Sequence, residues 1–458
     1  MSEVSVGTFG RLMEKARETM GSLTDGRKES NARRYEMRAA GMSGLSIFMM
    51  QDPSFLNFQR RLEESRGSGN FETIFCGDKI PSDNQIRNLL DGVDPSEFSG
   101  LFDFGLEALS ESGALNRFKT HDGFYLAAID GTEYHSSSKI NCEFCCRKEI
   151  KIKAKKRNKN VSVSDATPEL EESVRINYFH SVLAAAIVAP GINEAIPLIP
   201  EFVVPQDGHE KQDCENAAAK RWIKKHADRY RKLNLVLLGD DLMSREPICR
   251  AVKEAEMGFI FVCKPQSHKT LYEYVGRLAE RKTVRIERNG KKIRVDYRFM
   301  NDLPLKDGKD AMRVNWMDIR ETDEKTKNVI YRNSFVADIE ITKYNVKMMT
   351  EYGRARWKIE NENNNTLKTK GYCFEHNYGH GKKTLASVFS SLAIIAFLFH
   401  TVMNLIDSLY IAAKKKAGTR KGFFETLKAL TSYFVFDSWD LLMRFVLDPD
   451  DPVAQPRR

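Results

Sequence analysis

Two apolar runs that each lead to an aspartate constrain the fold of this chain most strongly. The run FYLAAID ends at Asp130, and the run LNLVLLG is followed at once by Asp240. Short apolar runs bounded by turn-forming residues predict the strands of a sheet. Hard cations such as Mg²⁺ take a few carboxylate ligands and complete their shell with water and substrate phosphate. The two runs therefore predict a sheet that carries part of a metal site at its strand ends.

A third acidic residue lies in a predicted helix over residues 352–370, which reads YGRARWKIENENNNTLKTK. Tyr352, Arg356 and Glu360 recur every four residues, so an α-helix projects them from one face. Glu362 then points the opposite way. Arginine grips phosphate oxygens with two prongs, which lysine cannot do. Taken alone, the segment also fits a solvated face with an Arg–Glu pair, but the two strand-end aspartates favour a metal site.

Three segments resemble, in the right order, the acidic motifs of DDE-class insertion-sequence transposases, in the branch with the Y-R-E-K signature. The segments are LAAIDGTEYHSS, LVLLGDDLMS and YGRARWKIENENNNTLKTKGYCFEHNYGHG, and the resemblance covers roughly residues 120–405. The spacing departs from the family pattern at two positions. Tyr352 lies four residues before Arg356 rather than three, and Lys368 lies eight residues after Glu360 rather than seven.

The resemblance implies a ribonuclease H-like catalytic domain that holds two Mg²⁺ (or Mn²⁺) ions. The catalytic residues and metal ligands would be Asp130, Asp240 and Glu360. Asp241 is the alternative second acid, and Asp240 is preferred because it lies nearer the end of its strand. The resemblance further implies phosphate contacts from the signature residues Tyr352, Arg356 and Lys368.

The activity that the resemblance implies is DNA transposition by two-metal phosphoryl transfer. The partner would be double-stranded DNA, both transposon ends and target, and a homodimer is expected because two ends must be joined. The expected location is the prokaryotic cytoplasm, at the nucleoid. Two alternatives remain open: a ribonuclease H-like nuclease without strand transfer, and a non-catalytic DNA-binding protein descended from a transposase.

The order of predicted elements indicates an α/β fold with a mixed sheet and helices on both of its faces. Three strands, a helix, a strand, a helix and a strand follow one another after residue 123, which is the ribonuclease H-like order. The Asn289-Gly290 pair between alternating runs predicts a hairpin. The expected parts are an N-terminal helical domain (1–118), the first part of the core (119–264), a β-rich insertion (265–345), the second part of the core with the acidic helix (346–412) and C-terminal helices (413–458).

The helical N-terminal region is the candidate DNA-binding domain. Ser82 and Gln85 form a capping-box pattern that opens a helix from Asp83 to Leu90. Arg87 would be exposed on this helix and would enter a major groove. A helical cap that only packs on the core is the equally plausible alternative.

Charge and cysteine content agree with an intracellular nucleic-acid-binding protein. The formal net charge of +9 over 458 residues permits a polyanionic partner without proving one. Eight cysteines without a signal-peptide pattern before them favour a reducing compartment. The lysine-rich residues 148–159 are predicted to form a mobile loop that contacts phosphates.

A CxxCC pattern raises the question of zinc. Cys142, Cys145 and Cys146 lie in the loop predicted after the first strand, and His180, His209 or Cys214 would complete four tetrahedral ligands. A single CxxC without a second is a weak signal. The sequence therefore favours free cysteines in a loop over a zinc site.

Residues 384–403 are nearly free of charged side chains and are long enough to span a bilayer. Serine and histidine side chains interrupt the apolar surface, and the segment soon follows the predicted acidic helix. The pattern favours a core helix over a transmembrane one, so no membrane partner is expected.

Overall fold

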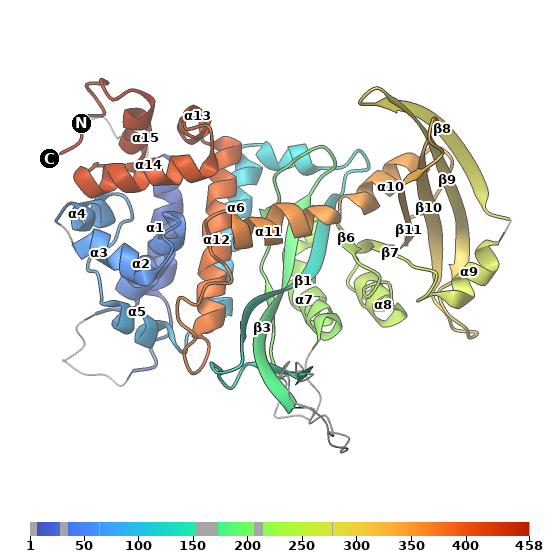
Figure 1. The fold of residues 1–458 in the computed structure, drawn as a ribbon, viewed down its shortest axis with the longest axis horizontal. Helices are drawn as coiled ribbons and strands as arrows, with labels where there is room; N and C mark the ends of the chain where they lie inside the picture. Colours follow the sequence, from blue (N-terminus) through green and yellow to red (C-terminus); the bar gives the residue numbers. More distant parts are fainter. Residues whose placement is uncertain are drawn as a thin grey trace, which may run out of the picture.

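The computed structural model describes residues 7–27, 35–63, 65–152, 173–205, 214–276 and 278–457. These residues form a mixed α/β structure around one 11-stranded sheet with the strand order β2-β3-β1-β6-β7-β11-β10-β9-β8, and with β4 and β5 beside β3. Helices from both ends of the chain gather beside this sheet (Figure 1).

The first part of the chain is helical. Its elements are α1 (Thr8–Gly21), α2 (Met37–Met49), α3 (Phe55–Glu63), α4 (Ser65–Thr73), α5 (Asp83–Leu90), η1 (Pro95–Phe98), α6 (Ser99–Glu111) and η2 (Ala114–Phe118). The predicted capping box is confirmed, because Ser82 accepts from the Gln85 backbone while the Gln85 side chain accepts from the Ser82 backbone.

The central strands and their helices follow. They are β1 (Tyr125–Ser137), β2 (Cys146–Ile152), β3 (Ser173–Val188), β4 (Ile196–Pro197), β5 (Glu201–Val203), α7 (Glu215–Tyr230), η3 (Arg231–Leu233), β6 (Leu235–Gly239), α8 (Glu246–Glu254) and β7 (Gly258–Val262). Strand β1 is antiparallel to β3 and parallel to β6, which is parallel to β7.

Helices cover both faces of these strands, as the sequence predicts. On β6, Leu235 and Leu237 belong to the core that includes Trp222 of α7. Val236 and Leu238 belong to a second core that includes Met349 of α10. Alternate side chains of a strand point to opposite faces, so a run that is apolar throughout needs a helix layer on each side.

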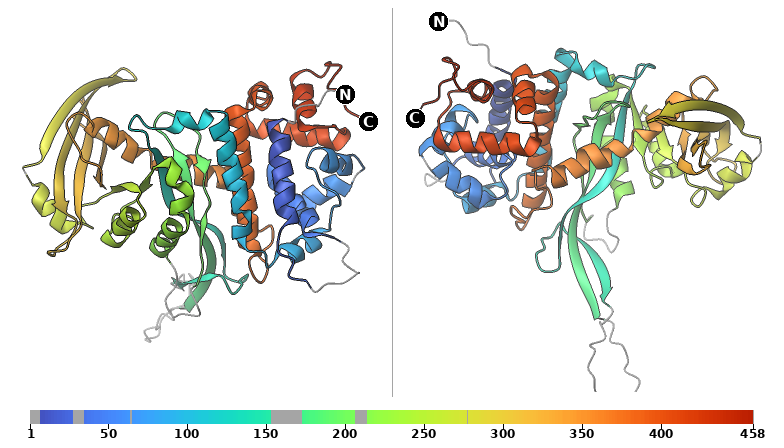
Figure 2. Two further views of the ribbon diagram at one scale, coloured as in Figure 1. Left: turned by 180° about the vertical axis from the view of Figure 1, so that it is seen from behind. Right: turned by 45° about the horizontal axis from the view of Figure 1, so that its top comes forward.

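The predicted mobile loop of residues 148–159 is wrong at its beginning. Strand β2 takes up residues 146–152 and pairs antiparallel with the first residues of β3, from Cys146 opposite Phe179 to Ile152 opposite Ser173. Charged residues and isoleucine alternate over residues 149–152, which suits a strand. The pair projects from the body of the molecule (Figure 2). Residues 153–159 lie outside the described residues.

The β-rich insertion extends the same sheet rather than forming its own. Asn289 and Gly290 have φ angles of 52° and 72°, which confirms the predicted hairpin turn. The last strand of the insertion pairs with β7, with Phe335 opposite Val262. The elements are α9 (Lys269–Val275), β8 (Glu280–Arg288), β9 (Lys291–Pro304), β10 (Arg313–Asp323) and β11 (Val329–Ala337).

The last part of the chain is again helical. It contains α10 (Val346–Arg354), a π-helical segment η4 (Ile359–Asn364), α11 (Asn365–Thr369), α12 (Leu385–Ile406), α13 (Ser408–Lys416), α14 (Arg420–Tyr433) and α15 (Trp439–Leu447). Helices α10 and α11 run across the sheet toward α12 (Figure 1).

Helix α12 is a core helix, as predicted. It is 22 residues long with a mean hydropathy of 2.0, so by length and composition it is the one helix in the described ranges that could cross a membrane. In this structure 94% of its most apolar stretch is buried, and it packs against α2, α6 and α13. The buried His400 of this helix has polar partners, since it contacts both the Tyr372 hydroxyl and the Met49 carbonyl.

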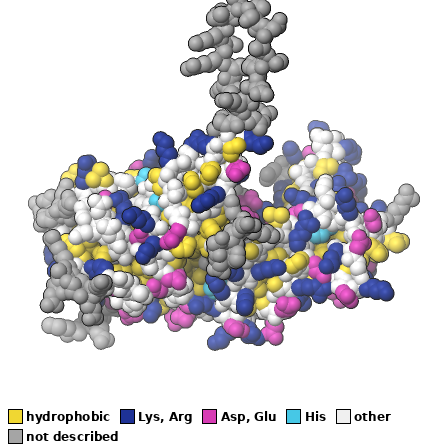
Figure 3. Space-filling view, turned by 90° about the horizontal axis from the view of Figure 1, so that it is seen from below, with side chains coloured by type: hydrophobic (Ala, Val, Ile, Leu, Met, Phe, Trp, Pro, Cys, Tyr) yellow, Lys and Arg dark blue, Asp and Glu magenta, His cyan; other side chains and the backbone are white. Residues whose placement is uncertain are grey.

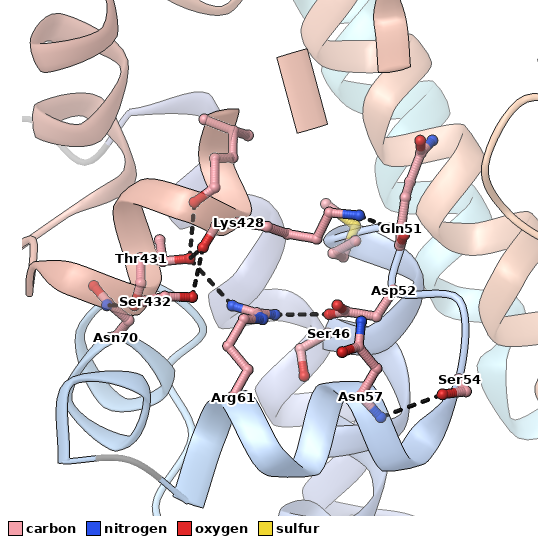
Figure 4. A network of polar contacts seen from close by, with 12 residues as sticks. Ser46, Gln51, Asp52, Ser54, Asn57, Arg61, Asn70, Lys428, Thr431 and Ser432 are labelled. Carbon is pink, nitrogen blue, oxygen red and sulfur yellow. Dashed lines mark hydrogen bonds and ion pairs between the residues drawn. The ribbon is translucent and has the colours of Figure 1, made fainter. Parts of the chain in front are cut away.

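The N-terminal and C-terminal helices share one core. Phe9 of α1 stacks on Trp439 of α15, with ring centroids 4.0 Å apart. Arg61 of α3 donates to the buried carboxylate of Asp52 at 2.7 Å and to the Thr431 hydroxyl of α14 at 3.1 Å (Figure 4). The segments expected as 1–118 and 413–458 are therefore packed together.

Candidate active site

The pairing of β1 with β6 brings the two predicted aspartates together. Ala128 of β1 lies opposite Leu238 of β6 in a parallel register. Asp130 follows two residues later within β1, and Asp240 follows two residues later just beyond the end of β6, so the register brings the two aspartates to neighbouring places. Because Ala128 faces the core that includes α10, the strand alternation directs Asp130 to the same face. Asp240 is close enough for its carboxylate to contribute to raising the pKa of Asp130.

Arg356 joins the third acidic residue to this pair. Its Nη2 donates to Glu360 Oε1 at 2.6 Å, as the four-residue spacing predicts. Its Nη1 lies 4.0 Å from Asp130 Oδ1. The arginine side chain is 19% exposed, so this contact is partly shielded from water. One guanidinium therefore connects the strand carboxylate of Asp130 with the helical carboxylate of Glu360.

Burial and the nearby carboxylates shift the pKa of Asp130. Burial raises the pKa of Asp130 to about 7, although the nearby Arg356 guanidinium opposes the rise. The neighbouring carboxylates of Glu360, Glu215 and Asp240 also contribute to this rise, in that order. Carboxylates that repel one another in a partly buried place are typical of sites that a cation neutralises.

Glu215 is a member of this cluster that the sequence analysis missed. It is the first residue of α7. A Cβ atom on Gly131 would lie 2.2 Å from its carboxyl carbon, so the glycine after Asp130 leaves the space that Glu215 fills. Burial and the Asp240 carboxylate raise the pKa of Glu215. The glycine directly after Asp130 is the sequence signal of this close approach.

Asp240 and Asp241 have different surroundings in the structure. Asp241 forms hydrogen bonds with the loop after β7. Its Oδ1 accepts from the Lys264 backbone at 2.6 Å, and its Oδ2 accepts from the Ser267 hydroxyl. His268 lies 4.0 Å from the same carboxylate. The Asp240 carboxylate instead contributes to raising the pKa of Asp130. The geometry therefore agrees with the choice of Asp240 as the second acid.

The single helix expected over residues 352–370 is wrong. Helix α10 ends at Arg354, the chain turns at residues 355 and 356, and Glu360 lies in the π-helical segment η4. The buried Lys358 donates to the Ile192 carbonyl at 2.6 Å, which holds the segment after the turn against the chain that follows β3. π-Helical turns often occur at functional sites.

Tyr352 does not lie on the face of Arg356 and Glu360. It is 4% exposed, and its ring meets the ring of Phe124 edge to face with centroids 5.7 Å apart. Phe124 precedes Asp130 by six residues, or about 20 Å of extended strand. The predicted shared face is therefore wrong for Tyr352, because burial of the ring in the core under α10 outweighs the helical spacing.

Lys368 and Arg87 have partners within the protein. Lys368 of α11 forms an ion pair with Glu375 at 2.8 Å. Arg87 of α5 donates to the Tyr378 carbonyl at 2.8 Å and to Asp83 at 3.0 Å. Both side chains hold the loop that follows α11, and DNA contact by either one stays a prediction.

Surface charge does not by itself mark a DNA-binding groove. Lysine and arginine side chains are spread over the face seen from below, with acidic side chains among them (Figure 3). The acidic cluster therefore carries more information than the net charge.

Asp130→Asn is expected to stabilise the metal-free protein more at pH 8 than at pH 5. The folded pKa of about 7 lies above the unfolded value, so ionisation of Asp130 costs stability progressively between about pH 4 and 7. Asparagine cannot ionise, and the gain should reach roughly 1–3 kcal/mol. Thermal unfolding in chelator measures it. A difference that does not change with pH would contradict the crowded cluster.

No protein-family model matches the chain, and a search of curated proteins found no match.

Proposed function

We propose that the chain is a metal-dependent DNA transposase that cuts at transposon ends and transfers the freed strand into target DNA. The observation that supports this most is the acidic cluster. Asp130 lies on β1 and Asp240 lies just after β6, the strand that pairs parallel to β1, and Arg356 links Asp130 to Glu360. This set also matches the three motifs that resemble the DDE class.

The order of the central strands supports a ribonuclease H-like catalytic domain. The short strands β4 and β5 pair with β3, β3 is antiparallel to β1, and β6 and β7 follow in parallel. In this proposal the first acid stands on the first strand and the second stands just after the strand that pairs parallel to it. The insertion β8 to β11 separates these strands from the segment with Glu360.

The donor set fits Mg²⁺ or Mn²⁺, because every candidate ligand is a carboxylate oxygen. Burial and the neighbouring carboxylates raise the pKa of Asp130 to about 7, and a cation bound among these carboxylates would lower it again. Two such ions, when bound, activate an attacking water or 3′-hydroxyl and stabilise the leaving oxygen.

Arg356 supplies the positioning of the phosphate in this proposal. Its Nη1 is buried without a hydrogen-bond partner, while its Nη2 is held by Glu360. A buried donor without a partner is costly, and a phosphate oxygen of DNA would satisfy it. Arginine is the residue best suited to that contact.

The test is an assay of Mg²⁺-dependent cleavage and joining by the purified chain. The substrate is duplex DNA that carries the flanking ends of the encoding element, with a second duplex as target. The expected result is a nick that leaves a 3′-hydroxyl at the element end, followed by a product joined to the target. Cleavage without joining would favour the nuclease alternative, and binding without cleavage would favour the non-catalytic one.

A further inference from the structure

A second group of metal-ligating side chains lies outside the acidic cluster. Cys142 and Cys145 come from the loop between β1 and β2, His180 from β3, and His380 from the loop between α11 and α12. One ligand atom from each of the four lies within 4.8 Å of all the others. Cys145, His180 and His380 are buried, and Cys142 is half-buried.

The distances between these atoms match a tetrahedral zinc shell. With Zn–S bonds of about 2.3 Å and Zn–N bonds of about 2.0 Å, tetrahedral geometry separates two sulfurs by about 3.8 Å and a sulfur from a nitrogen by about 3.5 Å. The Cys142 and Cys145 sulfurs are 3.8 Å apart. Both sulfurs lie 3.4 Å from His180 Nε2, and Cys145 Sγ lies 3.4 Å from His380 Nε2.

We propose that Cys142, Cys145, His180 and His380 bind one structural Zn²⁺ ion. Two thiolates neutralise the charge of the ion, so the closed site carries no net charge into its buried surroundings. All four positions of the tetrahedron are taken by side chains, which leaves no place for a reacting water. The ion therefore holds the fold together and does not take part in DNA cleavage.

The ion would connect three segments that lie far apart in the sequence. It would join the β1–β2 loop and β3 to the loop that follows the segment with Glu360. Strand β1 also carries Asp130, so the zinc would tie the strand that carries Asp130 to the loop that follows the segment with Glu360. The geometry of the four Cys and His side chains indicates zinc whether or not the chain is a transposase.

The CxxC pattern is a weak signal in the sequence because the two histidine ligands lie elsewhere along the chain. His380 is 235 residues from Cys145, so no local spacing reveals it. Of the other candidates, Cys214 is exposed and lies outside the group of four, and His209 lies outside the described residues. Cys146 belongs instead to the apolar core, where its sulfur meets the Val203 carbonyl. In this proposal Cys142 and Cys145 are zinc ligands, whereas the sequence favoured free cysteines in a loop.

A disulfide between Cys142 and Cys145 is the competing arrangement. A disulfide requires sulfurs about 2.05 Å apart, whereas here they are 3.8 Å apart. Both histidine nitrogens also point at sulfur, which a disulfide would not require.

The test is metal analysis of the full chain, purified under reducing conditions with trace zinc. The expected result is about one zinc per chain, and after exchange a cobalt form with the visible absorption of tetrahedral Co²⁺ bound to thiolate. His380→Ala should weaken zinc binding by about 100-fold or more in competition with a chelator. His380→Cys, which keeps four ligands, should retain the ion.

His376→Ala is the matched control, because His376 is exposed in the same loop and outside the group of four. It should leave the zinc content unchanged. The wild-type measurement stands even if His380→Ala fails to fold. Zinc well below one per chain, with Cys142 and Cys145 freely reactive toward a thiol reagent or joined in a disulfide, would overturn the proposal. Neither outcome depends on DNA cleavage.

Discussion

Glu360→Ala is expected to abolish Mg²⁺-dependent cleavage and joining, with a loss of at least about 1,000-fold in rate. The Glu360 carboxylate is the one that Arg356 connects to Asp130, and its removal leaves two aspartates to hold the ions. The side chain of Glu360 is 50% exposed, so the substitution should cost little stability. Single-turnover kinetics on the end-bearing duplex measures the loss.

Glu362→Ala is the matched control, because it removes a carboxylate two residues away in the same π-helical segment. Burial lowers the pKa of Lys358, and the nearby Glu362 carboxylate opposes that shift. It lines a separate hollow together with Asn193 and Lys414. Its loss should leave cleavage near the wild-type level. Equal loss of cleavage in the two variants, with both proteins still folded, would contradict a specific role of the Glu360 carboxylate. It would mean that the local structure of the segment is what matters for cleavage.

Arg61→Met is expected to destabilise the protein by about 3–5 kcal/mol. The Asp52 carboxylate is fully buried, and the Arg61 side chain, 10% exposed, is its ion-pair partner at 2.7 Å (Figure 4). Methionine keeps much of the arginine stem but leaves a buried charge without its ion-pair partner. The same substitution removes the contact with Thr431 that ties α3 to α14. Urea unfolding measures the change, and Arg60→Met, whose side chain is exposed, is the control.

The loss in Arg61→Met should depend on pH. Burial raises the pKa of Asp52, and Arg61 opposes that rise. Without Arg61 the folded pKa rises further above the unfolded value, so the native state binds a proton that the unfolded state has released. The penalty should be complete above the new folded pKa and should shrink as the pH falls through it. A penalty that is constant with pH would mean that lost packing, rather than the buried charge, is responsible.

The central strands and two members of the acidic cluster could be predicted from the sequence. An apolar run that ends in an acidic residue indicates a buried strand with a polar end, and Asp240 does lie just after the end of β6. Asp130 lies inside β1 instead, because this strand continues beyond the apolar run to Ser137 and pairs with β3 along that length. The Arg356–Glu360 contact also followed from local spacing, since a four-residue step brings side chains together in a helical segment.

Other residues had local patterns that tertiary packing overrode. Tyr352 has the right spacing to join Arg356, but its aromatic ring gains more from burial against Phe124. Arg87 was expected to be exposed on a short polar helix, but it is half-buried and its guanidinium donates to the Tyr378 carbonyl. Spacing along one element does not reveal which neighbouring element will cover it.

The sequence by itself determined the kind of most elements, the end of β6 and the identity of three candidate catalytic acids. These depend on the alternation of apolar and polar side chains over a few residues, which acts within one segment. Only the tertiary structure decided that Glu215 stands beside Asp130, and that His180 and His380 meet Cys142 and Cys145. Those neighbours come from segments tens to hundreds of residues apart, brought together by burial of apolar surface between whole elements.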